Sequence, residues 1–283
     1  MGMRKFDLRK LIKHITLILA LTVLLALGIA YPFLSGEYDQ LAFAISTMIQ
    51  VFGLVGLSFV PIGILWALMP KYRFAFAIAT VIVSTIVILI ISLFATLSVG
   101  KAFGLLTILL WTFITVLLIP KIKQLKGQTF KKSDWLPLYL TCLPIFTLLM
   151  QLALAKHLTQ QSRNRAIENA NRFIRHIEEY YTQHGHYPLT LQAQNKDYYP
   201  DVVGVEKYVY APHRKGYNLS FEQPRFLLDR LGTREWVVYN PLDENSVYSH
   251  TAWLLSTEQA EPSQGWYASG NTGHQHWKYF LFD

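Results

Sequence analysis

Five long apolar runs fill the first 155 residues, and they constrain the fold more than any other feature of the chain. A helix needs about 20 apolar residues to cross the hydrocarbon core of a bilayer. The runs that reach or approach this length are 15–34, 41–69, 74–97, 102–119 and 135–155. We therefore predict an N-terminal membrane region over 1–134 with four spans, a fifth span over 135–155, and the lipid bilayer as a partner.

Composition supports a membrane protein, because 52% of the 283 residues are hydrophobic and only 16% are charged, against about 25% charged in soluble domains. No Asp, Glu, Lys or Arg lies well inside a run, which disfavours transport driven by intramembrane carboxylates. Pro61 and Pro144 predict kinks in the second and fifth runs. We expect Gln50 and Gln151 to form hydrogen bonds between helices.

Basic residues gather in alternate loops, and this distribution predicts the orientation. They lie before the first run, in the 70–73 turn and in the 120–134 loop, whereas the 34–40 loop has none. We predict a multi-pass protein of the cell inner (cytoplasmic) membrane, with a cytoplasmic N-terminus and with residues 156–283 periplasmic or extracellular. The first run could instead be a signal peptide cleaved near Gly28-Ile29-Ala30. Its length favours a retained anchor.

Charge and cysteine content exclude several functions. Residues 156–283 hold 13 Lys/Arg and 14 Asp/Glu, so this segment lacks the basic balance of a nucleic-acid-binding domain. We expect no nucleic-acid partner. Cys142 is the only cysteine, which excludes an intramolecular disulfide and a Cys-based zinc site.

After the fifth run the pattern becomes that of an amphipathic helix, followed by short strands. An apolar stripe recurs at three- and four-residue steps from Ile167 to Tyr181, and Gly185 is a suitable stop. The predicted strands are 207–211, 217–222, 225–229, 235–240, 246–250, 265–269 and 277–282. We predict a membrane all-α bundle plus a C-terminal α+β domain over 156–283, in which one long helix packs on an antiparallel meander.

The helix end carries a motif that resembles a known family. Tyr180, Tyr181, Gly185, Tyr187 and Pro188 follow an apolar helix that becomes amphipathic. This arrangement resembles type IV pilins and type II secretion pseudopilins over about 136–250. In that family the hydrophobic helix begins the mature protein and carries an early Glu that guides filament assembly. Here four other runs precede the helix and that Glu is missing. The resemblance therefore implies a pilin-like domain shape without incorporation into a filament.

Candidate chemical groups are few. His184, His186, His250, His274 and His276 could together bind a divalent metal, but no ligand motif accompanies them, and we predict solvated histidines in turns. Asp229 and Asp243 could be an acid–base pair, although paired carboxylates are common. We find no nucleophile elbow, P-loop or dinucleotide motif. We therefore expect no catalytic, cofactor-binding or metal-binding residues and no cofactor.

The aromatic content after residue 180 suggests either a sheet core or a recognition surface. The residues predicted for such a surface are Trp253, Trp266 and Tyr267, with an envelope protein or a glycan as partner. The leading hypothesis is a non-enzymatic membrane protein that displays a pilin-like domain for envelope recognition or assembly. The alternative is a membrane enzyme or transport component with its site at the outer face of the spans.

Overall fold

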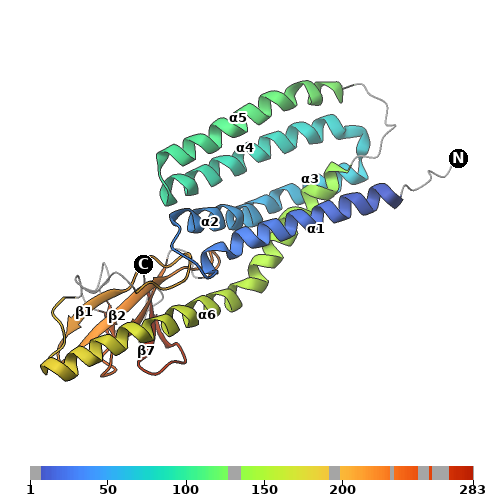
Figure 1. Ribbon diagram of the computed structural model, residues 1–283. Coiled ribbons are helices and arrows are strands. Elements are labelled where there is room, and N and C mark those ends of the chain that lie inside the picture. Colours follow the sequence, from blue (N-terminus) through green and yellow to red (C-terminus); the bar gives the residue numbers. More distant parts are fainter. Residues whose placement is uncertain are drawn as a thin grey trace. The chain divides into compact units, whose positions relative to one another are not determined.

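The computed structural model describes residues 8–126, 135–190, 198–229, 233–247, 255–256 and 268–282. The chain forms two compact units. We call 1–30 with 44–154 the helical unit, and 31–43 with 155–283 the C-terminal unit. Figure 1 shows both units and labels some of their elements.

The helical unit consists of apolar helices joined by short turns. In chain order these are α1 (Leu8–Ala30), α2 (Gln40–Val55), η2 (Gly56–Ser58), α3 (Phe59–Leu68), η3 (Pro70–Tyr72), α4 (Arg73–Ser98), α5 (Lys101–Gln124) and the first part of α6 (Leu136–His184). Five helical segments among the described residues are long and apolar enough to cross a membrane. These segments match the five apolar runs of the sequence.

The second span is interrupted earlier than Pro61 predicts. Helix α2 ends at Val55, a 3₁₀ turn covers Gly56–Ser58, and α3 begins at Phe59. Pro61 therefore lies in the first turn of α3, where a backbone N–H would have no partner within the helix. Pro144 lies inside α6, which is helical on both sides of it.

Polar side chains inside the helical unit bond to one another. The amide of Gln151 donates to the Gln50 carbonyl oxygen at 3.3 Å, and the Gln50 amide donates to Ser46 Oγ at 2.9 Å. Ser46 Oγ in turn donates to the carbonyl oxygen of Ile29 at 2.7 Å. These buried contacts confirm the interhelical hydrogen bonds predicted for the two glutamines.

The C-terminal unit is a sheet packed on the second part of α6, as Figure 1 shows for β1, β2 and β7. The five-stranded sheet is antiparallel, in the order β1-β2-β3-β7-β6. Its strands are β1 (Val209–His213), β2 (Gly216–Gln223), β3 (Arg234–Tyr239), β6 (Ala268–Asn271) and β7 (Trp277–Phe282), and β4 (Ser246–Val247) pairs with β5 (Leu255–Ser256) in a small second sheet.

The core lies between α6 and one face of the sheet. Ile167, Phe173 and Ile177 of α6 pack with Tyr217 and other buried residues of β2, β3 and β7. Each large apolar side chain buried in this way contributes about 1.5–3 kcal/mol. The predicted amphipathic stripe is therefore the face of α6 that the sheet covers.

The strand predictions are confirmed in part. β7 has the predicted bounds, and β1, β2 and β3 lie within two residues of theirs. The strand predicted at 225–229 is wrong, because 227–229 form a turn in which Arg225 Nη2 bonds to the Asp229 carbonyl oxygen at 2.5 Å. The simple meander is also wrong, since β7 lies between β3 and β6. Residues 248–250 and 265–267 of two predicted strands lie outside the described residues.

Candidate functional site

The predicted recognition residues Trp253, Trp266 and Tyr267, and also His250, lie outside the described residues. Most of the described aromatic residues of the C-terminal unit belong to its core. Tyr208, Tyr217 and Trp277 are buried there, and the partly buried tyrosines packed against them are Tyr187, Tyr198, Tyr210, Tyr239 and Tyr279. In this part of the chain, the aromatic content chiefly joins helix to sheet.

The motif at the end of α6 turns the chain back toward the sheet. Gly185 has a φ of 74°, and its N–H donates to the Tyr181 carbonyl oxygen at 2.8 Å. This left-handed position is one that glycine adopts without strain. The Tyr187 ring then stacks on Tyr181 with centroids 4.4 Å apart, and buried Pro188 accepts a hydrogen bond from Tyr210 Oη at 2.6 Å.

Glu178 joins this turn to the sheet. Its two carboxylate oxygens accept hydrogen bonds from Tyr217 Oη at 3.0 Å and from Tyr187 Oη at 3.2 Å. Burial, followed by the Glu178 charge, raises the pKa of Tyr187 to about 12, and burial raises the pKa of Tyr217 still further. Both phenols therefore remain protonated donors at physiological pH.

The predicted histidine and carboxylate candidates are held by separate partners. His274 Nε2 lies 3.2 Å from Asn164 Oδ1, and His276 Nδ1 lies 3.0 Å from Asp243 Oδ1. Asp229 pairs with Arg225 at 3.0 Å. Among the described ranges, no group of three or more His, Cys, Asp or Glu side chains is placed to hold a metal ion.

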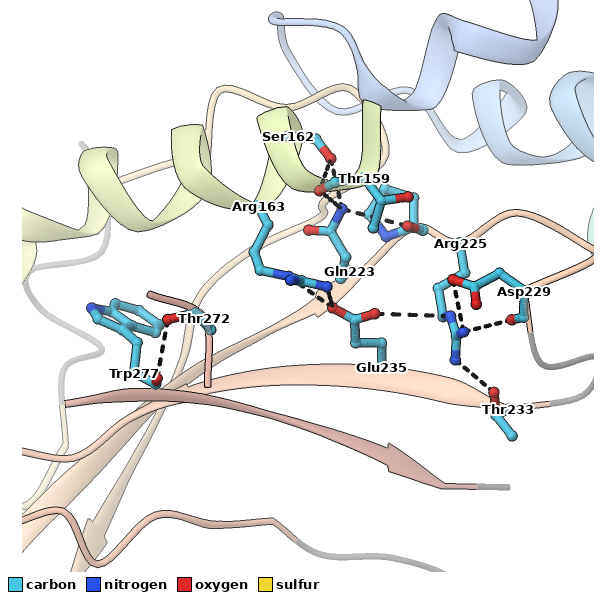
Figure 2. A network of polar contacts seen from close by, with 11 residues as sticks. Thr159, Ser162, Arg163, Gln223, Arg225, Asp229, Thr233, Glu235, Thr272 and Trp277 are labelled. Atoms are coloured by element: carbon cyan, nitrogen blue, oxygen red, sulfur yellow. Dashed lines mark hydrogen bonds and ion pairs between the residues drawn. The ribbon is translucent and has the colours of Figure 1, made fainter. Parts of the chain in front are cut away.

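A charged cluster that sequence reasoning missed joins α6 to β3 (Figure 2). Arg163 of α6 contacts Glu235 Oε1 through Nη2 at 2.5 Å and through Nε at 3.0 Å. Arg225 Nε lies 3.8 Å from Glu235 Oε2 on the other side. Only 3% of the Glu235 side chain is exposed. Burial raises the pKa of Glu235, and the two guanidinium groups oppose that rise, so each charge depends on the others for its stability.

A neutral contact beside this cluster joins α6 to β2. The Gln223 amide, at the end of β2, donates to Ser162 Oγ at 2.6 Å and to the Thr159 carbonyl oxygen at 3.4 Å. Figure 2 shows Ser162 and Thr159 on α6, facing the Gln223 side chain of the sheet. The polar contacts of Thr159, Ser162 and Arg163 therefore fix the start of the amphipathic segment to the sheet. Its later turns combine apolar packing with the hydrogen bond between Glu178 and Tyr217.

The segment 31–43, which runs from the 3₁₀ turn Tyr31–Phe33 into the first turn of α2, is part of the C-terminal unit. Its backbone pairs with 203–204: Val203 N–H donates to the Leu34 carbonyl oxygen at 3.0 Å, and Asp39 N–H donates to the Val203 carbonyl oxygen at 3.0 Å. Gly204 N–H donates to the Pro32 carbonyl oxygen at 2.8 Å. A short loop predicted only to link two spans is thus built into the distant domain.

Two features make this contact specific. A Cβ added at Gly204 would lie 2.6 Å from the Pro32 carbonyl oxygen, so the two backbones approach as closely as only glycine permits. Within the loop, Tyr31 Oη donates to Asp39 Oδ2 at 2.7 Å. The Tyr31 hydroxyl and then the Leu41 N–H hold the pKa of Asp39 below its ordinary value.

Comparison with known proteins gives no relative for this chain: no family model matches it, and neither the curated proteins nor the solved structures contain a match.

Proposed function

We propose that the chain is an integral membrane protein that holds a pilin-like α+β domain at the outer face of the cytoplasmic membrane, where the domain serves recognition or assembly in the cell envelope. The observation that supports this most is the position of 31–43 within the C-terminal unit. This position supports two parts of the proposal: the side of the membrane on which the domain lies, and the retention of the domain at the membrane.

Sidedness follows from the contact between the loop and the domain. Polar backbone cannot pair across a bilayer, so residues 31–43 and 155–283 must occupy the same side if the helices span. If all five apolar helices span, the first loop and residues 155–283 lie on the same side, and the basic residues of the alternate loops support the outer side for both.

Retention follows from connectivity. The chain passes between the two units at three points, 30/31, 43/44 and 154/155. A filament subunit attached by one helix can leave the bilayer by withdrawing that helix. Withdrawal of this domain would also require α1 and α2 to leave the bilayer or the loop to detach, and exposure of their apolar surface to water opposes the first route.

Cysteine labelling in intact cells tests the sidedness. In a Cys142→Ala background, Ser35→Cys in the loop and Tyr199→Cys in the domain should both react with a membrane-impermeant maleimide. Lys71→Cys is the matched control and should react only after lysis. If the first two positions were labelled only in lysed cells, the proposed orientation would be wrong.

Fractionation and crosslinking test the role. The domain should remain with the membrane after cells are sheared, and photocrosslinkers at exposed domain positions should capture an envelope protein or polymer. Recovery of the intact chain in sheared filaments would contradict retention. Crosslinks confined to lipid and to the chain itself, in cells that carry all their envelope components, would contradict recognition.

A further inference from the structure

Two histidines flank the left-handed glycine that ends α6. His184 is the last residue of the helix, and His186 follows Gly185, whose φ is 74°. The two imidazole centroids are 6.2 Å apart, and both side chains are exposed. This turn therefore places two imidazoles side by side at an accessible surface.

The contacts of the Nδ1 atoms define the state of each ring. His184 Nδ1 lies 2.9 Å from the Tyr180 carbonyl oxygen, and His186 Nδ1 lies 3.1 Å from the Tyr187 carbonyl oxygen. A carbonyl oxygen can only accept, so each Nδ1 carries the hydrogen and each neutral ring keeps a lone pair on Nε2. Within the described residues, neither Nε2 atom has a hydrogen-bond partner.

This arrangement is typical of histidines that bind metals. Donation from one ring nitrogen to a backbone carbonyl fixes the tautomer and makes the other nitrogen more basic. Tyr180 further orients both rings: it stacks on His184 with centroids 4.0 Å apart and meets His186 edge-on at 5.8 Å. The C-terminal end of a helix also carries partial negative charge, which favours a cation there.

We propose that His184 and His186 bind one transition-metal dication of the zinc, copper and nickel class through their Nε2 atoms, with water completing the coordination. Nitrogen–metal bonds of about 2.0–2.1 Å in a tetrahedral arrangement place the two ring centroids about 5 Å apart. The exposed rings must therefore approach by about 1 Å, a small rotation for side chains on either side of a glycine. This site does not depend on the proposed role of the domain.

Copper binding to the purified full chain tests the site. The chain carries an affinity tag without histidine and is stripped of metal in detergent. Cu²⁺ is the first probe because it binds nitrogen sites most tightly among these ions. Calorimetry should show one Cu²⁺ ion bound per chain, and this binding should be lost when both histidines are replaced. Electron paramagnetic resonance should show nitrogen coupling from two imidazoles. Zn²⁺ should compete for the site, whereas Ca²⁺, which prefers oxygen ligands, should not.

Variants separate this site from other histidines. His184→Asn and His186→Asn should each weaken binding at least about tenfold, and the double variant should abolish it while its circular dichroism is unchanged. His274→Asn with His276→Asn is the matched control and should bind normally. Undiminished binding by the folded His184/His186 double variant, or no copper binding by the unmodified chain, would overturn the proposal.

Discussion

The rings of Phe33 and Phe226 stack with centroids 4.6 Å apart and an interplanar angle of 18°. Phe33 is 3% exposed and Phe226 is 2% exposed. Phe33 is the last residue of the first apolar segment, and Phe226 follows β2. The pair is an apolar contact between the segment 31–43 and the rest of the C-terminal unit. Together with the backbone bonds to Val203 and Gly204, it makes the loop a structural part of the C-terminal unit.

Phe33→Ala should destabilise the C-terminal unit by about 3–5 kcal/mol, because truncation of a buried Phe removes contacts and leaves a cavity. Chemical unfolding of the full chain in detergent measures the change. Phe226→Ala should cost a similar amount, and the double variant should reveal a coupling of about 0.5–1.5 kcal/mol from the ring pair. Tyr199→Ala, at a position 58% exposed, is the control and should change stability by less than about 0.5 kcal/mol. Strictly additive effects of the two Phe variants would show that the rings are not in contact.

Glu235→Gln should destabilise the unit by about 3 kcal/mol or more, since it takes the carboxylate from the largely buried Arg163 guanidinium and leaves Arg225 with Asp229. The chain offers a matched surface pair on the neighbouring strands: Arg234 and Glu222 also lie 2.5 Å apart but have side chains 44% and 46% exposed. Glu222→Gln should cost only about 0–1 kcal/mol. Equal losses at the two sites would contradict the buried character of the α6–β3 contact.

Gly204→Ala should release the loop 31–43 from the domain, because the new Cβ would lie too close to the Pro32 carbonyl oxygen. Overpacking of this kind costs about 1–3 kcal/mol. Hydrogen exchange should show faster exchange of the Val203 and Asp39 amides, which pair across this contact. Gly216→Ala provides the control, since its Cβ would meet its nearest neighbour at 3.4 Å, and exchange at the loop should then be unchanged.

The C-terminal unit should lose stability between pH 10 and 12. Burial raises the pKa of Tyr187 and of Tyr210 to about 12, from an ordinary value of 10.0. In this interval the folded chain holds more protons than the unfolded chain, so the free energy of unfolding falls as the pH rises. Tyrosinate absorbance and near-ultraviolet circular dichroism should change together. Tyr187→Phe should make the decline shallower, and a decline of unchanged steepness would contradict the raised pKa of Tyr187.

Local patterns were sufficient to predict the helices and the strand at 277–282. The apolar runs, the stripe from Ile167 to Tyr181 and the stop at Gly185 all reflect forces that act between neighbours in sequence. The contact of Arg163 with Glu235 joins residues 72 positions apart, and a Glu in an alternating strand ordinarily indicates a solvent-facing position. Only the fold reveals that Glu235 faces α6.

The turn at 227–229 and the contacts of the loop 31–43 could not be predicted from local sequence patterns either. Residues 225–229 have a strand-like composition, but the bonds from Arg225 to Asp229 favour a turn. The hydrogen bonds from 31–43 to the domain go to backbone atoms of 203 and 204, which every residue type carries. Phe33 alone does not identify Phe226 as its partner in the fold. The contacts of the His184 and His186 Nδ1 atoms likewise depend on the backbone carbonyl oxygens of Tyr180 and Tyr187.

The inclusion of 31–43 in the C-terminal unit also determines the order in which that unit can form during synthesis. The ribosome makes Phe33 well before it makes Val203, Gly204 or Phe226, so the loop must wait for its binding surface until these residues have been made. A nascent chain that stops before Val203 leaves this loop without its backbone partners. The loop is thus completed only by residues that are made after the four later apolar helices.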